Sequence, residues 1–279
     1  MVRRSDNRSC ALRRGVQIFN LNIESELPDI LRLSSGTASI VCSDQGVKYD
    51  DDARVPLGPW RDVTVSEANE LVATLPSDSL GLLVVLLRLP VEMLRILHQL
   101  ELDEINTMYG SFDEDNDLQR LLMSYIKSLC SVGGDIFFHS LISHPPGLMT
   151  VTRDPTSGVF YGLHVDSWDS PPGQDRARAA NRITINVGKV DRTFLFVNLT
   201  VDEMAREAQL PPTDLGSTSA TNIGRRFLAA FPDYPVVGVR LRPGEAYIAP
   251  TDNIMHDGSS QDARSTSWHV TVRGHISLA

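Results

Sequence analysis

The spacing of hydrophobic residues changes about halfway along the chain. In the first half they recur at helical intervals, most clearly in "DLQRLLMSYIKSLC" (117–130), where apolar residues at i, i+3, i+4 and i+7 form one face. Two further segments predict helices: "TVSEANELVATL" (64–75), with Ser66 as its N-cap, and "PVEMLRILHQLELDEI" (90–105), which begins with Pro90. A glycine pair, Gly133-Gly134, ends this helix-rich part.

Beyond residue 134 the pattern is that of short strands separated by turns. A helical stretch from Val201 to about Pro235 interrupts them. We therefore predict a single α+β domain, with a helix-rich support over 1–134 and a jelly-roll, cupin-like core over 135–279. The segments with strand character are "DIFFHSLI", "GLMTVTRD", "GVFYGLHVD", "NRITINVG", "RTFLFVNLT", "VVGVRLRP", "EAYIAP" and "STSWHVTVRG".

Composition and charge narrow the class of protein. The apolar content of 42% and charged content of 22% are typical of a soluble globular chain, and the net charge of −9 argues against a nucleic-acid-binding face. Cys10, Cys42 and Cys130 are widely spaced, which suits a reducing compartment and provides no zinc motif. The longest apolar run, Leu80 to Leu87, is too short to span a bilayer, and no secretory signal is evident. We expect a cytoplasmic protein without a membrane partner.

The stretch "YGLHVDSWDS" contains the first candidate for metal chemistry. Side chains two residues apart on a strand point to the same side, so His164 and Asp166 project together. An imidazole and a carboxylate supply two ligands of a two-histidine, one-carboxylate triad, the arrangement of non-haem Fe(II) oxygenases. Taken alone, the pair is equally compatible with an ordinary polar contact at a strand end.

A third ligand must come from another strand. Of the histidines that follow Asp166, His256 is favoured because it follows the strand "EAYIA" and precedes a turn expected at Asp257-Gly258. His269 lies in the middle of a strand, where a packed histidine is usual, and His275 lies in the terminal tail.

A keto acid bound to such a metal needs a cation for its far carboxylate, and arginine binds carboxylates through two parallel hydrogen bonds. Arg264 follows His256 by eight residues, at the start of the last strand. If that strand returns antiparallel beside His256, Arg264 faces the same cavity, and Thr266 on the same side adds a hydroxyl group. Arg273 is the weaker candidate because it lies at the far end of the strand.

The order HxD, then His256 about ninety residues later, then Arg-x-Thr resembles the Fe(II)/2-oxoglutarate-dependent oxygenase superfamily over Gly147 to Arg273. The resemblance implies a double-stranded β-helix in which His164, Asp166 and His256 bind iron. It also implies that Arg264, assisted by Thr266, binds 2-oxoglutarate. The implied reaction consumes O₂ and 2-oxoglutarate and releases succinate and CO₂. Because Asp166 is present, hydroxylation or a related oxidation is implied rather than halogenation.

Substrate identity and oligomeric state stay open, and we expect a small molecule, such as an amino acid or an intermediate of specialised-metabolite biosynthesis. Tyr161, Trp168 and Asn186 are candidate substrate-pocket residues, and the segment after Asp166 is a candidate lid. Two alternatives remain: a two-histidine, one-carboxylate enzyme that does not use 2-oxoglutarate, and a cupin-like binding protein without a catalytic metal.

Overall fold

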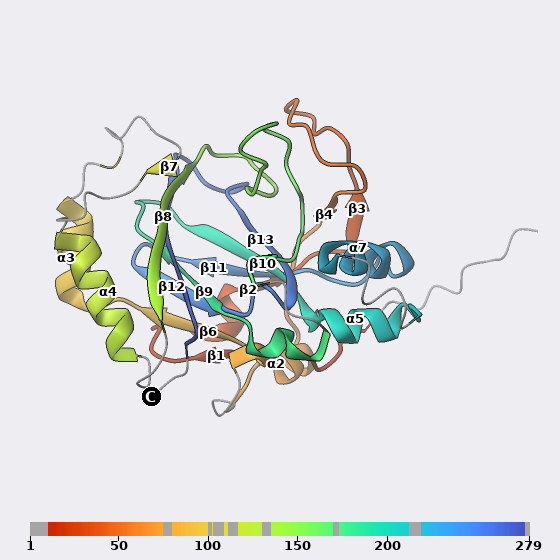
Figure 1. Cartoon of the computed structure of the whole chain (residues 1–279), viewed down its shortest axis with the longest axis horizontal. Helices are drawn as coiled ribbons and strands as arrows, with labels where there is room; N and C mark the ends of the chain where they lie inside the picture. Colours follow the sequence, from red (N-terminus) through yellow and green to blue (C-terminus); the bar gives the residue numbers. More distant parts are fainter. Residues whose placement is uncertain are drawn as a thin grey trace, which may run out of the picture.

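Two β-sheets lie face to face, and their inward side chains form a shared core (Figure 1). The computed structural model describes residues 11–74, 80–99, 102, 109–110, 117–129, 135–169, 173–211 and 219–276. The core between the sheets contains aromatic and aliphatic residues from both, including Phe194 and Phe196 from one sheet and Tyr247 and Leu86 from the other. The protein is therefore a mixed α+β protein rich in sheet.

The larger sheet has seven strands and is antiparallel except where its first two strands pair. Their spatial order is β1 (Gln17–Asn20), β6 (Leu83–Arg88), β12 (Glu245–Ala249), β9 (Asn181–Asn186), β14 (Ser267–Gly274), β8 (Ile136–His144) and β7 (Tyr109–Gly110). The smaller sheet has the order β13 (Ile254–Ser259), β10 (Arg192–Thr200), β11 (Val237–Leu241), β2 (Leu31–Leu33) and β5 (Arg61–Asp62). A separate hairpin pairs β3 (Thr37–Ser39) with β4 (Arg54–Pro56).

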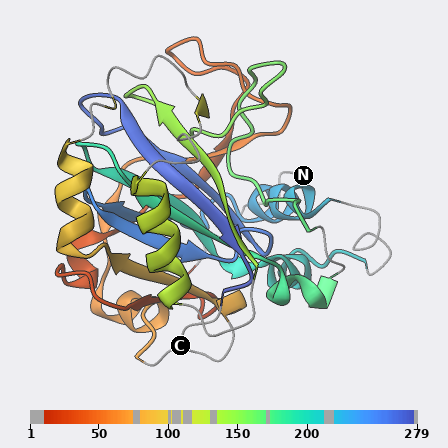
Figure 2. The same ribbon diagram turned by 60° about the vertical axis from the view of Figure 1, so that its left-hand side comes forward.

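Alternation along the strands decides which side chains reach the interior. On β14, Trp268, Val270 and Val272 belong to the hydrophobic cluster that includes α3 (Val91–Gln99) and α4 (Asp117–Leu129). Figure 2 shows these two helices across the outer face of the larger sheet. The intervening residues of β14 are polar and buried, and they face the other sheet: Ser267, His269, Thr271 and Arg273. The inner side of this strand is thus built for a polar site.

The helical insertion covers the outer face of the smaller sheet. It comprises α5 (Val201–Glu207) and α7 (Ala220–Ala230), between β10 and β11, as the sequence predicts. Leu195 and Val197 on β10 share a cluster with Phe227 and Met204 of these helices. Phe194 and Phe196 alternate with them and point into the central core.

The segment 158–166 is extended but less regular than predicted. It pairs through isolated bridges, one of which joins His164 to His256 on β13. The segment "GLMTVTRD" forms no named strand, although Arg153 makes a single bridge. Asp257-Gly258, expected as a turn, lies inside β13, so the chain turns only after this strand ends.

The first half of the chain is more than a helical support, because β1 and β6 extend the larger sheet and β2 and β5 extend the smaller one. Its first predicted helix is α2 (Val65–Leu71), capped by Thr64 and not by Ser66. Thr64 and Glu67 form a reciprocal capping box, which leaves Ser66 inside the first turn. The helices predicted at 90–105 and 117–130 correspond to α3 and α4.

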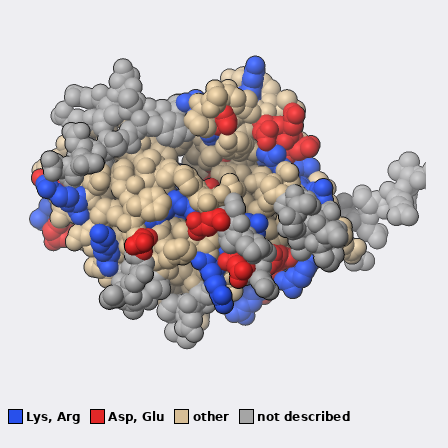
Figure 3. Space-filling model, in the orientation of Figure 1, with Lys and Arg blue, Asp and Glu red and all other residues tan. Residues whose placement is uncertain are grey.

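Cys42 is exposed and forms no disulfide, whereas Cys10, Cys130, Gly133 and Gly134 lie outside the described residues. Among the helices that the structure describes, none combines the length and apolar character needed to cross a bilayer. Acidic and basic side chains are interspersed over the face shown in Figure 3.

Candidate metal centre

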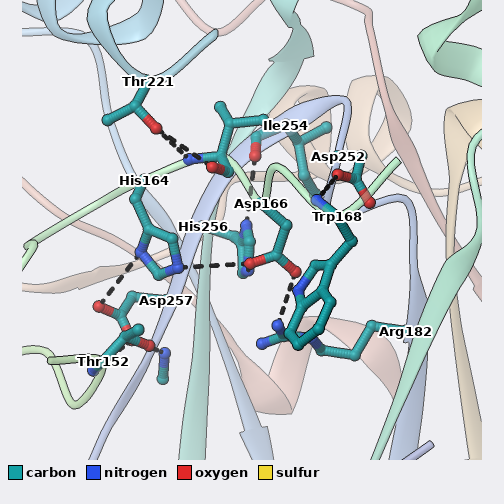
Figure 4. Close-up of polar contacts among 12 residues, drawn as sticks. Thr152, His164, Asp166, Trp168, Arg182, Thr221, Asp252, Ile254, His256 and Asp257 are labelled. Carbon is teal, nitrogen blue, oxygen red and sulfur yellow. Dashed lines mark hydrogen bonds and ion pairs between the residues drawn. The ribbon is translucent and has the colours of Figure 1, made fainter. Parts of the chain in front are cut away.

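Three side chains expected as metal ligands meet in the interior. His164 and His256 are joined by two backbone hydrogen bonds, His164 N to His256 O (3.0 Å) and His256 N to His164 O (2.8 Å). The backbone N–H of Asp166 donates to Thr251 O (2.9 Å), which continues the pairing. One ligand atom from each of His164, Asp166 and His256 lies within 4.8 Å of the others, and all three residues are buried. Figure 4 shows their side chains directed toward one another.

The orientation of the two imidazoles suits metal binding. Nδ1 of His164 lies 3.0 Å from Gly162 O, and Nδ1 of His256 lies 3.3 Å from Ile254 O. Backbone acceptors at Nδ1 favour the tautomer that leaves Nε2 free to coordinate. The two Nε2 atoms lie 3.6 Å and 3.8 Å from Oδ1 of Asp166, respectively. Nε2 of His256 is buried and has no hydrogen-bond partner among the described residues.

The charges around the triad set the protonation of its members. Burial favours the neutral form of Asp166, but the charges of Arg182 and His256 and the pairing with His164 hold its pKa well below the usual range. Burial lowers the pKa of His256 to about 3. Burial also opposes a charge on His164, yet its contacts with Asp166 and Asp257 leave its pKa raised. At neutral pH, Asp166 therefore offers an ionised carboxylate and His256 a neutral imidazole, the forms that bind divalent metals, whereas a metal would have to compete with a proton at His164.

The helical insertion holds the residue between the first two ligands. The backbone N–H of Val165 donates to Oγ1 of Thr221 (3.0 Å), and the Thr221 hydroxyl donates to Val165 O (3.1 Å). Thr221 lies in the first turn of α7. This helix therefore fixes the backbone from which His164 and Asp166 project.

The triad opens into a cavity of about 730 Å³. One wall comes from the larger sheet and the loop after Asp166, and the other from α7 and the segments before the first ligand. Residues that line it beyond the triad include His139, His144, Thr152, Tyr161, Trp168, Arg182, Thr184, Arg192, Thr221, Asn222, Arg225, Tyr247, Asp257 and His269. A cavity of this size accommodates small-molecule ligands.

A buried arginine lies at the start of β10 in the same cavity. Arg192 is 4% exposed, and its Nε and Nη1 atoms have no hydrogen-bond partner among the described residues. His144 and His269 stack on each other nearby, with ring centroids 5.2 Å apart. Burial, together with the charge of Arg192, lowers the pKa of both, that of His144 to about 3. A buried guanidinium with two nitrogens that have no partner among the described residues, beside two neutral imidazoles, is suited to an anionic group.

Comparison with known proteins yields only distant likenesses. No protein-family model and no curated protein matches the sequence. Similar solved structures are those of the Kdo hydroxylase KdoO, a non-haem Fe(II) α-ketoglutarate-dependent dioxygenase. Its cobalt(II) complex has a TM-score of 0.40 at 13% identity, covering 71% of this chain and 81% of that one. Its complex with α-ketoglutarate and Fe(III) has a TM-score of 0.38 at 14% identity, with the same coverage. At this distance the case for the site depends on its own geometry.

The structure does not bring Arg264 or Thr266 to the triad. β13 and β14 belong to different sheets, so the connection between them crosses from one sheet to the other instead of forming a hairpin. Arg264 is exposed in this connection and lines a second cavity with Trp60 and Arg240. Thr266 lines a third, small cavity. The predicted carboxylate clamp is therefore not assembled by these two residues.

The three candidate substrate residues have different placements. Tyr161 and Trp168 line the triad cavity, with Tyr161 donating to Oδ2 of Asp154 (2.9 Å) and Trp168 54% exposed. Asn186 is fully buried outside that cavity, where its amide donates to Val190 O and Leu241 O and its Oδ1 accepts from Gly188 N. Asn186 therefore contacts the β9–β10 connection and the end of β11 and does not line the triad cavity. The expected lid includes residues 170–172, which lie outside the described residues.

Sequence reasoning missed three charged residues that surround the triad and ranked a fourth, Arg273, below Arg264. The missed residues are Arg182, Arg192 and Asp257, whereas Arg273 is a direct neighbour of Asp166. A signal for Arg192 was present, because it alternates with Phe194 and Phe196 and so shares their inward side. Asp257 sits in the segment that was expected to be a turn, and this expectation removed it from consideration.

Proposed function

We propose that this protein is an Fe(II)- and 2-oxoglutarate-dependent dioxygenase that hydroxylates, or otherwise oxidises, a small molecule. The observation that carries the proposal is the convergence of His164, Asp166 and His256 in a cavity that also holds a buried arginine, Arg192, whose Nε and Nη1 have no hydrogen-bond partner among the described residues. Two histidines and one carboxylate with open positions are the ligand set of non-haem Fe(II) oxygenases.

The strand order supports a jelly-roll interpretation of the core. From β8 onward, successive segments alternate between the two sheets, apart from β10 and β11, which pair directly. Segment 158–166 contributes to the smaller sheet through its bridge to β13. We interpret these eight segments as a double-stranded β-helix, with the first two ligands at the end of its second segment and His256 on its seventh.

The residues present fit an iron ion. The Nε2 atom of His256 is buried without a hydrogen-bond partner among the described residues, and Asp166 is kept ionised by its neighbours. Bound to the three side chains, Fe(II) would supply the oxygen chemistry that couples decarboxylation of 2-oxoglutarate to oxidation of a second substrate. The part of the chain is to orient the ligands and to neutralise the co-substrate.

Arg192 is the residue proposed to bind the far carboxylate of 2-oxoglutarate. A Cβ atom added at Gly258, two residues after His256, would lie 2.6 Å from Nη2 of Arg192, so the guanidinium lies against the strand that carries the third ligand. Glycine at this position leaves the space that the arginine occupies. Arg192 thus replaces Arg264 in the role that the sequence suggested for the latter.

The proposal is tested by adding Fe(II) and then 2-oxoglutarate to the apo-protein without oxygen and recording the visible charge-transfer band of the chelate. The wild-type protein should show the band, and His256→Ala and Asp166→Ala should lose it. Arg192→Met should raise the 2-oxoglutarate concentration needed for half-maximal band intensity about 10- to 100-fold. The reason is that a charge-assisted hydrogen bond contributes about 1.5–3 kcal/mol. Arg264→Met, the matched control, should behave as wild type.

The other outcomes separate the alternatives. A protein that binds the metal but shows no band with 2-oxoglutarate is a metal enzyme of another chemistry. A protein that binds no divalent metal is a binding protein, and the proposal fails. Release of succinate, stimulated by candidate small molecules, then identifies the substrate.

A further inference from the structure

The two oxygens of Asp166 have different surroundings. Oδ1 faces Nε2 of His164 and of His256, at 3.6 Å and 3.8 Å. Oδ2 faces the opposite way and contacts Nη2 of Arg182 at 2.6 Å and Nη1 of Arg273 at 3.3 Å. One oxygen is therefore directed at the candidate metal position, while two guanidinium groups hold the other.

Arg273 is itself held in place from several sides. Its side chain is 1% exposed, and its Nη2 contacts Oδ2 of Asp252 at 2.7 Å. The other oxygen of Asp252 accepts from the backbone N–H of Trp168 (3.0 Å), and the Trp168 ring lies over the guanidinium at 4.8 Å. The planar fork of arginine can bridge two carboxylates in this way, which an ammonium group cannot do as well.

The arrangement follows from the sheet register. Arg273 on β14 is the direct partner of Arg182 on β9, so two like charges stand side by side on neighbouring strands. Such a pair is unfavourable unless carboxylates neutralise it. Asp166 contacts both arginines, and Asp252 contacts Arg273. These two buried carboxylates therefore neutralise the charges of the arginine pair.

We propose that Arg182 and Arg273 are positioning residues that restrict Asp166 to binding a metal through Oδ1 alone. This inference rests on the proposed function. Carboxylates bind metals through one oxygen or through both, and a second oxygen would take a position that the triad must leave open for its co-substrate. By holding Oδ2, the two arginines keep that position free.

The test uses cobalt(II) as a spectroscopic probe, with its affinity measured by calorimetry and its visible absorption recorded. Arg182→Met should bind cobalt(II) about 10- to 100-fold more weakly, as is usual when a residue that orients a metal ligand is removed. Its absorption should change in shape and intensity as Asp166 alters its binding mode. Arg182→Lys keeps a donor to Oδ2 and should restore most of the wild-type spectrum. Arg178→Met is the matched control, because Arg178 is an exposed arginine of the same region.

The role of Arg273 is tested in a double variant, because replacing Arg273 alone would leave the buried carboxylate of Asp252 without its ion-pair partner and could unfold the protein. In Asp252→Asn/Arg273→Met both charges are removed together, while the amide oxygen can still accept from Trp168 N. It should show the same direction of change in the cobalt(II) spectrum. If Arg182→Met and the double variant both bind cobalt(II) with wild-type affinity and spectrum, the inference is overturned. If the wild-type protein binds no cobalt(II), the proposed function itself fails.

Discussion

Asp257 should strengthen metal binding by holding the ring of His164. Its Oδ1 accepts from the backbone of Val151, Thr152 and Gly258 and from the Thr152 hydroxyl, at 2.7–3.3 Å. Its Oδ2 has no hydrogen-bond partner among the described residues and lies 3.7 Å from Nδ1 of His164. In Asp257→Asn the amide oxygen can keep every bond of Oδ1, so the substitution alters mainly the contact with His164.

The size of the effect is bounded from two sides. Two full charges 3.7 Å apart would interact by about 4.5 kcal/mol at an effective dielectric constant of about 20. Burial raises the pKa of Asp257, which opposes its ionisation and weakens this attraction. Residues that orient metal ligands contribute about 10- to 100-fold in affinity, or about 1.4–2.7 kcal/mol. We expect the lower end of this range, a loss of about tenfold.

Calorimetric titration of Asp257→Asn with cobalt(II) measures the effect, with thermal unfolding of the apo-protein as the check on folding. Asp262→Asn, at an exposed acid of the following connection, is the control and should bind as wild type. An Asp257→Asn variant that is folded and binds cobalt(II) with unchanged affinity would refute the reasoning. It would mean that the carbonyl of Gly162 alone orients His164.

Three further predictions concern stability, measured by urea unfolding. Thr64→Ala should lower the free energy of unfolding by about 1 kcal/mol through loss of the helix cap, whereas Ser66→Ala should change it by less than about 0.5 kcal/mol. Arg61 and the cap lower the pKa of Glu67 from 4.5 to about 2, so its stabilising effect is complete above pH 4.5 and is lost as the pH falls toward 2. The stability gap between wild type and Glu67→Gln, about 0.5 kcal/mol for a partly exposed pair, should therefore narrow from pH 4.5 to pH 3, and a constant gap would contradict this. Gly224→Ala should be destabilising by about 1–3 kcal/mol because the new methyl group meets Met255, but in a Met255→Ala background it should be neutral or stabilising, since alanine favours the helix.

The sequence was sufficient to predict local features and the convergence of the three side chains of the triad. Alternating residues predicted β9, β10, β11, β12 and β14, and helical spacing predicted α4. The three candidate ligands could be predicted because the HxD pattern places two side chains on the same side of a strand and only three histidines follow it in the sequence. The capping residue was also predictable, since Thr64-Val65-Ser66-Glu67 contains the T-x-x-E pattern of a capping box.

What the sequence could not supply was the assignment of strands to sheets. Arg264 and His256 are close in sequence, and only the crossing from one sheet to the other separates them. Conversely, Arg192 and Arg273 are far from the ligands in sequence and reach the triad through pairing over long distances. A charged residue in a strand has the same local pattern whether it faces solvent or a buried carboxylate, so the electrostatic surroundings of Asp166 emerge only from the fold.

The mutual backbone hydrogen bonds between His164 and His256 have a consequence for the order of events during synthesis. These bonds close a loop that contains most of the C-terminal half of the chain, and such distant pairings form late because the entropy of closing the loop opposes them. The last strand, β14, then inserts between β8 and β9 in the middle of the larger sheet. A nascent chain still attached to the ribosome therefore displays His164 and Asp166 without their partner. If the triad binds a metal as proposed, the complete ligand set therefore exists only after this long-range pairing has formed.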